Sequence, residues 1–464
     1  MLKKRFCDFL KFSETPRGSL LVFLLILLLA AIPRVWLLQR VAPHDFYHND
    51  GDEYMELSKQ LAAGNGMSLS YYRWHEVAPP GTAGKEILHT DLARTPLFPL
   101  LGAALYFLPV DLFFSARVLS LLLALLAVYC TWLIGKELGG KICGHVSALI
   151  FALYPYALYY TISWSTENLF LICIALGFLF LLKSCRGKIH LFPWSGFFLA
   201  LATLTRPNAI LLAPLFILIL LCRGYYPGAL KLTGYSLSGF RKKLSAGTMK
   251  YSIVFLLVFL FCLFPWTLRN RIAGGSWNPT TYYGGYVFWL SSSEIMYETY
   301  RTLDTAEYAS ATKEMWDKEH EKYKAKLLQT GKTDFIAMSG QWKEWGMEKI
   351  RQEPDKFLYI LKERFFHFWR MCPNLVILTP VQIVLLRIFF TVLFSIALTG
   401  LYLYRKRFLF WCLTMPVVFG LITSVPFLFV LRYRYPIFAP YVCTAASLSI
   451  CCMLRKWIKN KVLS

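Results

Sequence analysis

The sequence predicts an all-α protein that crosses a membrane many times. Two observations predict this fold class. Hydrophobic residues make up 56% of the 464 residues and charged residues only 17%, whereas a soluble domain carries about a quarter charged residues. The apolar residues also gather in runs of about 20, which is the length that a helix needs to cross a bilayer.

We expect about ten spans, and this number places both chain ends on the same side of the membrane. The two pieces on either side of Pro207 are short, so a single broken helix is the alternative to a hairpin there. The candidate spans are 20–38, 113–134, 142–159, 164–182, 192–205, 207–222, 251–268, 381–404, 408–425 and 436–454.

The net charge of +23 is explained by membrane topology rather than by nucleic-acid binding. One set of predicted loops and both tails are strongly basic, and their only acids are Asp8, Glu14 and Glu137. Cytoplasmic segments of membrane proteins show this excess of Lys and Arg. We therefore expect both termini to be cytoplasmic, in the cell membrane of a prokaryote.

The first span and the cysteines fit this topology. Residues 20–38 follow a basic start, as in a signal peptide, but no small-residue cleavage site follows them, so we expect a retained anchor. Of the twelve cysteines, only Cys372 falls clearly in a predicted outer segment. No disulfide framework is therefore expected.

The spans divide the chain into seven segments. Two of them are long loops outside the membrane, so we expect the chemistry at the outer surface. An apolar piece at 96–110 is too short to span, which favours an interfacial or re-entrant helix, and 354–370 has the spacing of an amphipathic helix lying on the membrane. The segments are a cytoplasmic tail (1–19), the first span (20–38), an extracytoplasmic loop (39–112), a transmembrane bundle (113–268), a second extracytoplasmic loop (269–380), C-terminal spans (381–454) and a cytoplasmic tail (455–464).

Acidic residues at the predicted outer surface are the first candidates for chemistry. Asp50, Asp52 and Glu53 cluster about ten residues after the first span. Clustered carboxylates can shift one another's pKa, act as a general base or bind a cation; the alternative is a solvated loop. Glu167 lies at the outer end of the fourth span, where an acid among apolar residues marks either a functional site or a side chain that snorkels to the interface.

Several cationic residues share this outer level, against the usual distribution of charge. A phosphate or pyrophosphate is the natural partner for them, because guanidinium groups bind it through two parallel hydrogen bonds. Ordinary anchoring at the interface is the alternative for any single arginine. The residues are Lys85, Arg94, Arg206, Arg269, Arg432 and Arg434.

Histidines in the first loop raise the question of a metal. Their spacing matches no tight ligand motif. A divalent metal is conceivable, but the sequence requires neither a metal nor another cofactor. The residues are His44, His48, His75 and His89, beside Glu76 and Asp91.

Taken in order along the chain, these motifs resemble the GT-C glycosyltransferases of family 39, which include protein O-mannosyltransferases and the aminoarabinose transferase of lipid A. The resemblance runs from about residue 20 to residue 450. Each motif alone is weak, but the ordered set is fairly specific. The motifs are Asp52-Glu53-Tyr54, Leu61-Ala62-Ala63-Gly64-Asn65-Gly66, Ala93-Arg94-Thr95-Pro96, Tyr154-Pro155 leading to Thr166-Glu167, Leu204-Thr205-Arg206-Pro207, Pro265-Trp266 with Arg269-Asn270, and Arg432-Tyr433-Arg434-Tyr435-Pro436.

The resemblance implies a GT-C-like helix bundle that moves a sugar from a polyprenyl phosphate to an acceptor on the extracytoplasmic face, with inversion. Asp52 would deprotonate the acceptor hydroxyl, Glu53 would assist or orient, and Glu167 would be a second acid. Asp50 is an extra carboxylate that competes for the role of base. The cationic residues would hold the phosphate as charge develops on it, which a phosphate leaving group needs more than a general acid.

The acceptor remains open and is a lipid, a glycan or a protein. A transporter or flippase of lipid-linked sugars or other anionic lipids is the alternative function. It explains the spans, but it leaves the acid cluster in residues 39–112 without a role.

Overall fold

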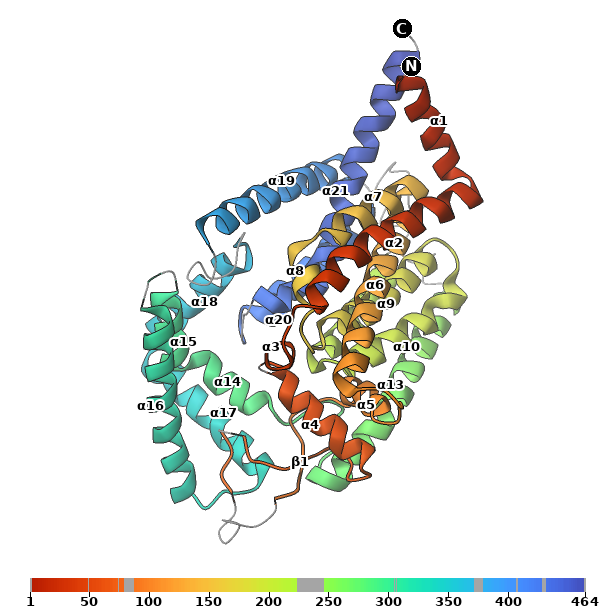
Figure 1. The fold of residues 1–464 in the computed structure, drawn as a ribbon. Helices are drawn as coiled ribbons and strands as arrows, with labels where there is room; N and C mark the ends of the chain where they lie inside the picture. The colour runs from red at the N-terminus through yellow and green to blue at the C-terminus, as the bar shows by residue number, and fades with distance from the viewer. Residues whose placement is uncertain are drawn as a thin grey trace.

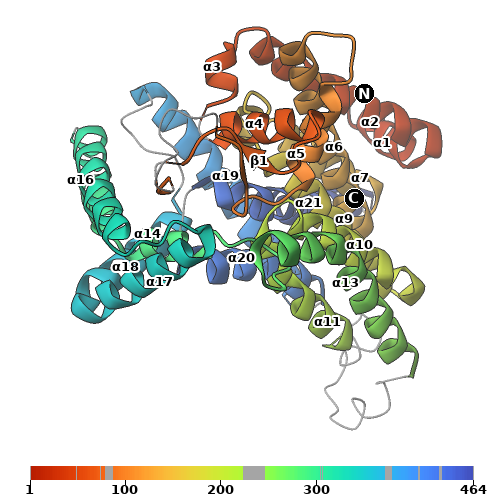
Figure 2. The same cartoon turned by 90° about the horizontal axis from the view of Figure 1, so that it is seen from below.

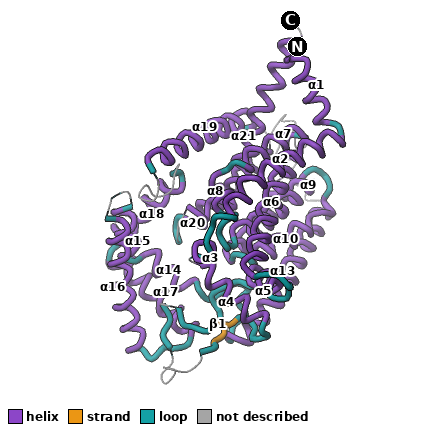
Figure 3. The backbone as a smooth tube through the Cα atoms, in the orientation of Figure 1, coloured by secondary structure: helices purple, strands orange, loops and turns teal. Residues whose placement is uncertain are grey.

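The computed structural model describes residues 2–48, 50–73, 75–78, 87–222, 246–303, 305, 307–370, 379–405, 408–427 and 431–462. These residues are mostly helical (Figures 1 and 3). The strands β1 (Ser68–Leu69) and β2 (His89–Thr90) pair antiparallel, with Ser68 opposite Thr90. The helices are α1 (Leu2–Glu14), α2 (Pro16–Leu38), α3 (Pro43–Phe46), α4 (Asp50–Ala62), α5 (Leu97–Leu105), α6 (Leu112–Gly139), α7 (Lys141–Ala152), α8 (Pro155–Tyr159), α9 (Glu167–Cys185), η1 (Ile189–Leu191), α10 (Phe192–Thr203), η2 (Pro207–Leu211), α11 (Leu212–Cys222), α13 (Ala246–Gly274), α14 (Gly284–Ser292), α15 (Glu294–Thr302), α16 (Tyr308–Gln329), α17 (Phe335–Gln352), α18 (Pro354–Phe368), α19 (Pro380–Tyr404), α20 (Phe408–Ser424) and α21 (Leu431–Val462).

Apolar helices lie at all ten predicted spans. Within the described residues, six of them are long and apolar enough to cross a membrane, namely α2, α6, α9, α13, α19 and α21. Four shorter apolar helices cover Lys141–Ala152, Ile189–Thr203, Pro207–Cys222 and Cys412–Ser424. The all-α, polytopic fold class predicted from the sequence is confirmed.

One predicted span is divided in the structure. The run 142–159 forms α7 and then the short α8, because α7 ends at Ala152 and the chain restarts at Pro155. Proline disfavours the α conformation in the residue before it, and Tyr154 is extended, with φ −67° and ψ 121°. The short α7 is therefore a local consequence of Pro155.

The helices form a bundle with an inner and an outer layer. Of the most apolar window of each helix, 83% is buried in α9 and 78% in α21, but only 22% in α2 and 17% in α19. The exposed residues of α2 and α19 are mostly large and apolar, as lipid-facing surfaces require. The starts of α9 and α21 meet in the protein interior, where the Tyr435 hydroxyl donates to Oδ1 of Asn168 at 2.8 Å.

Helices α14 to α18 form a second unit with its own core, called here the aromatic subdomain (Figure 2). Trp289 of α14 and Trp342 of α17 lie with ring centroids 4.4 Å apart, and both are about 1% exposed. Aromatic pairs at this separation stabilise a core beyond the area that they bury. The predicted amphipathic segment 354–370 contains α18, which exposes Leu358 and Phe365 and buries Ile360.

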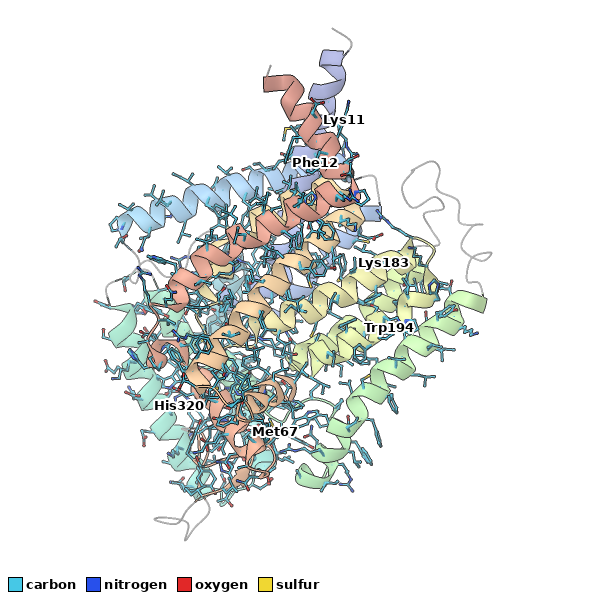
Figure 4. All side chains as sticks on the ribbon, turned by 45° about the vertical axis from the view of Figure 1, so that its right-hand side comes forward. Lys11, Phe12, Met67, Lys183, Trp194 and His320 are labelled. Atoms are coloured by element: carbon cyan, nitrogen blue, oxygen red, sulfur yellow. The ribbon has the colours of Figure 1, made fainter. Side chains whose placement is uncertain are left out.

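Figure 4 shows Lys11 near the top and Lys183 below it on the right, while Met67 and His320 lie in the lower part. The loop that follows α2 and the aromatic subdomain therefore share one end of the bundle.

Candidate active site

Helix α4 carries the predicted acid cluster, and its periodicity separates the three acids. Residues three and four apart lie on the same face of a helix, so Asp50, Glu53 and Tyr54 share one face. Tyr54 is buried, whereas Asp52 points away from this face and is exposed. The acids also occupy the first turn, where the helix dipole favours negative charge.

Backbone contacts hold the start of α4 beside the start of α9. The Trp164 amide donates to the Phe46 carbonyl at 2.8 Å. A Cβ on Gly51 would lie 3.1 Å from the Trp164 carbonyl oxygen, so a side chain there would push the two segments apart. This close approach brings the acidic face of α4 toward Glu167.

Asp50 binds arginines from two distant parts of the chain. Its Oδ1 lies 2.9 Å from Nη2 of Arg94, and its Oδ2 lies 2.5 Å from Nη2 of Arg432. Burial alone would raise the pKa of Asp50, but the charges of Arg94 and Arg432 outweigh it and hold the pKa well below the usual range. Asp50 is therefore ionised, and each of its carboxylate oxygens pairs with an arginine.

Glu53 belongs to a second, more deeply buried group centred on Arg73. Nη2 of Arg73 lies 2.5 Å from both Glu53 and Asp91, and Nη1 lies 2.7 Å from Glu76. Arg94 joins this group to Asp50, because its Nε donates to Glu53 at 2.7 Å. Three carboxylates around one guanidinium raise the pKa of Arg73, although burial acts in the opposite direction.

Glu167 forms the far end of the same array. Its side chain is 1% exposed and pairs with Arg206, whose Nε also donates to the Thr166 hydroxyl at 2.9 Å. Nε of Arg432 lies 3.8 Å from Glu167, and the ring of Tyr433 lies under both arginines. Arg432 therefore stands between the carboxylates of α4 and α9.

These contacts join nine residues into one continuous array, called here the ionic network. It draws on α4, the two loops around β1 and β2, the start of α9, the segment before η2 and the start of α21. Its members are Asp50, Glu53, Arg73, Glu76, Asp91, Arg94, Glu167, Arg206 and Arg432.

Two of the predicted phosphate-binding arginines bind backbone carbonyls instead of carboxylates. Arg269 donates to the carbonyl of Asp91 at 2.7 Å. Arg434 is 1% exposed and donates to the carbonyls of Phe368 and Arg370 at 2.5 and 2.8 Å. Lys85 lies outside the described residues.

Arg73 did not stand out in the sequence, although it makes the most ion pairs in the network. It lies in a polar loop between tyrosines and a histidine, where an arginine is usually a solvated charge. A signal in the sequence was the presence of Glu76 and Asp91 in the same loop region. If two acids are buried in the fold, they need a cation such as Arg73 nearby.

Two histidines of the first loop lie beside the same acid: His75 and His89 are 3.9 and 3.3 Å from Glu76. His75 also stacks on Tyr286 at 4.3 Å. His44 instead pairs with the adjacent Asp45 on the surface. Over the described ranges, no group of three or more His, Cys, Asp or Glu side chains is placed to hold a metal ion.

Several solved structures share this arrangement of helices. The archaeal oligosaccharyltransferase AglB from Archaeoglobus fulgidus, in complex with an inhibitory peptide and a dolichol-phosphate, matches with a TM-score of 0.55 and 12% identity, over 95% of this chain and 51% of that one. The same enzyme tethered to an acceptor peptide containing the NVT sequon matches with a TM-score of 0.54 and 13% identity, over the same shares. The chain therefore spans about half the length of these relatives. Its fold is that of the GT-C class of membrane glycosyltransferases.

A family model described as dolichyl-phosphate-mannose-protein mannosyltransferase matches residues 93–240 of the chain. ArnT from Cupriavidus metallidurans bound to undecaprenyl phosphate is also similar, with a TM-score of 0.39 and 12% identity, over 94% of this chain and 78% of that one. No curated protein matches the sequence.

Proposed function

We propose that this protein transfers a sugar from a polyprenyl-phosphate donor to an acceptor at the ionic network, on the extracytoplasmic face of the membrane. The observation that supports this most is the position of Arg432. It lies between Asp50 and Glu167 at the start of the buried α21. A guanidinium between two carboxylates at the end of a membrane bundle offers both a site for a lipid phosphate and a base.

The proposed reaction is a single inverting displacement. A carboxylate takes the proton of the acceptor hydroxyl, the oxygen attacks the anomeric carbon, and the bond from that carbon to the phosphate oxygen breaks. The lipid phosphate leaves as an anion, and cations fixed in a water-poor site stabilise the charge that develops on it. We assign this stabilisation of the phosphate charge to the network arginines Arg94, Arg206 and Arg432.

The geometry favours Asp50 over Asp52 as the base. Asp50 lies in the network beside Arg432, whereas Asp52 is exposed on the other face of α4. Glu53 then positions Arg94, and Glu167 positions Arg206 and Arg432. The sequence resemblance pointed to Asp52, so the two aspartates form a matched pair for experiment.

The test is transfer of radiolabelled sugar from polyprenyl-phosphate sugars by the purified protein in detergent. We expect Asp50→Asn to lower kcat by about 100-fold or more, the usual contribution of a general base, and Asp52→Asn to retain most of the activity. A large loss in Asp52→Asn alone would return the role of base to Asp52.

A transport assay addresses the alternative function. Protein in vesicles that moves lipid-linked sugar across the membrane, while it transfers none from any donor, would contradict the proposal and support a flippase.

A further inference from the structure

We propose that Asp50 and the phosphate of the donor compete for Arg432, so that donor binding releases Asp50 and makes it available as the base. The identity of the ligand as a lipid phosphate rests on the proposed function. The competition itself follows from the contacts of the network.

The first observation is that both carboxylate oxygens of Asp50 pair with arginines. Oδ1 is held by Arg94 and Oδ2 by Arg432, at 2.9 and 2.5 Å. A carboxylate paired on both oxygens is a poor acceptor for the proton of a hydroxyl, because protonation would break a charged hydrogen bond. Release of one arginine would therefore make Asp50 a stronger base.

The second observation is that Arg432 has an unused hydrogen-bond donor. Its Nε is buried and has no hydrogen-bond partner within the described part of the chain. Buried polar atoms are nearly always paired in native proteins, so an unpaired one at a site suggests a missing acceptor. A phosphate accepts from Nε and Nη2 of an arginine together, and Nη2 is the atom that Asp50 now occupies.

The third observation concerns charge. The network contains five carboxylates and four arginines, and Arg269 beside Asp91 brings the cations level with the anions. Among these described residues the charges balance, so a phosphate that binds Arg432 shares this arginine with a carboxylate. The carboxylate that loses its arginine then lies beside a new anion, and both changes increase its affinity for a proton.

The consequence is an order of events. Without donor, Asp50 is held by its arginines and does not activate an acceptor. With the phosphate on Arg432, the same carboxylate is free beside the reacting sugar. The acceptor hydroxyl is thereby activated only when the donor is in place.

The test measures the affinity of the purified protein for decyl phosphate by calorimetry, with inorganic phosphate as a parallel ligand. Asp50→Asn removes the competitor, so we expect it to bind decyl phosphate about 5-fold or more tightly than the wild type, which is the lower end of typical coupling between sites. Arg432→Gln should weaken binding, and Asp52→Asn should leave it unchanged. An Asp50→Asn protein that binds with equal or lower affinity overturns the proposal. Stronger binding of decyl phosphate than of inorganic phosphate would identify the lipid-linked source, and equal binding would assign the site to free phosphate.

A second measurement uses the wild-type protein, in case Asp50→Asn fails to fold. Carbodiimide modifies protonated, accessible carboxyl groups, and fragment mass spectrometry distinguishes Asp50 from Asp52. Decyl phosphate should increase the labelling of Asp50 relative to Asp52, and unchanged relative labelling overturns the proposal.

The two proposals fail in different ways. If the affinities change as expected but no sugar is transferred, the competition stands and the glycosyltransferase function falls. If sugar is transferred but Asp50→Asn leaves the affinity unchanged, only the competition falls.

Discussion

At the scale of single residues, arginines away from the surface meet two kinds of partner. Arg73, Arg94, Arg206 and Arg432 bind carboxylates in the ionic network. A second group binds carbonyls at the C-terminal ends of helices; for example, Nη1 of the buried Arg34 lies 2.9 Å from the carbonyl of Ala152, the last residue of α7. These carbonyls have no partner within their own helix, and the helix dipole favours a cation there.

The central position of Arg73 in the ionic network predicts that its removal strongly lowers the stability of the folded protein. Arg73→Met would leave Glu53, Glu76 and Asp91 buried without their common cation. Breaking a buried ion pair from one side costs about 3–5 kcal/mol, so we expect a clearly lower midpoint of thermal unfolding in detergent. Arg301→Gln, which removes an exposed pair with Glu298, is the control and should leave the midpoint unchanged; an equal effect of both variants would contradict this role of Arg73.

The pKa of Glu53 predicts acid sensitivity. Burial alone would raise this pKa, but the charges of Arg94 and Arg73 lower it from 4.5 to about 2. A carboxylate whose pKa is lowered by folding stabilises the protein above its unfolded pKa, and this stability is lost as the pH falls toward the folded pKa. The thermal midpoint should therefore decrease between about pH 4.5 and pH 2, and more steeply in the wild type than in Glu53→Gln. If the thermal midpoint falls equally with pH in both proteins, Glu53 does not contribute to the acid sensitivity.

At the scale of elements, α18 links the aromatic subdomain to the bundle. Arg364 of α18 is fully buried and donates to the carbonyl of Ser291 near the end of α14 at 2.7 Å. At the other end of the link, Arg434 of α21 donates to the carbonyl of Phe368, where α18 ends. Arg434 is two residues from Arg432, so this junction adjoins the ionic network.

This junction predicts a local effect of Arg434→Gln. Without the two hydrogen bonds to carbonyls, the end of α18 should open more often, because orphaned terminal carbonyls no longer stabilise the last turn. Hydrogen exchange followed by mass spectrometry should show faster exchange in 360–370 and little change in α4. Arg405→Gln, which alters an exposed arginine at the end of α19, is the control; uniform acceleration over the whole chain would instead indicate global destabilisation.

At the scale of the whole molecule, the helices separate two chemically different ends. Figure 4 shows Lys11 near the top and Lys183 below it on the right, while Met67 of the first loop and His320 of the aromatic subdomain lie in the lower part. The strongly basic loops predict that the end with Lys11 faces the cytoplasm.

This orientation predicts the labelling of introduced cysteines. Ser310 of α16 and Lys188, just after α9, are both exposed. In intact cells, a membrane-impermeant maleimide should label Ser310→Cys above the wild-type background and should label Lys188→Cys only after the membrane is opened. The reverse pattern would invert the topology.

The sequence was sufficient for the membrane helices because long apolar runs report directly on burial in lipid. The sequence did not predict the division of the span 142–159 at Pro155, because a proline either kinks a helix or ends it. The partners of the site residues were not predictable, because Arg432 and Asp50 are 382 positions apart and a charge pattern does not show which cation meets which acid. The sequence also does not distinguish Arg434 from Arg432. Both lie in the same short motif, but Arg434 binds backbone carbonyls and Arg432 binds carboxylates.

The distance along the chain between Asp50 and Arg432 also has a consequence for biosynthesis. The carboxylates at the start of α4 and α9 are made before Arg432, which is part of α21. Until α21 is made, Glu167 has Arg206 and Asp50 has Arg94, but the two halves of the network are not joined. A ribosome-bound chain that has not yet inserted α21 therefore cannot form the complete ionic network.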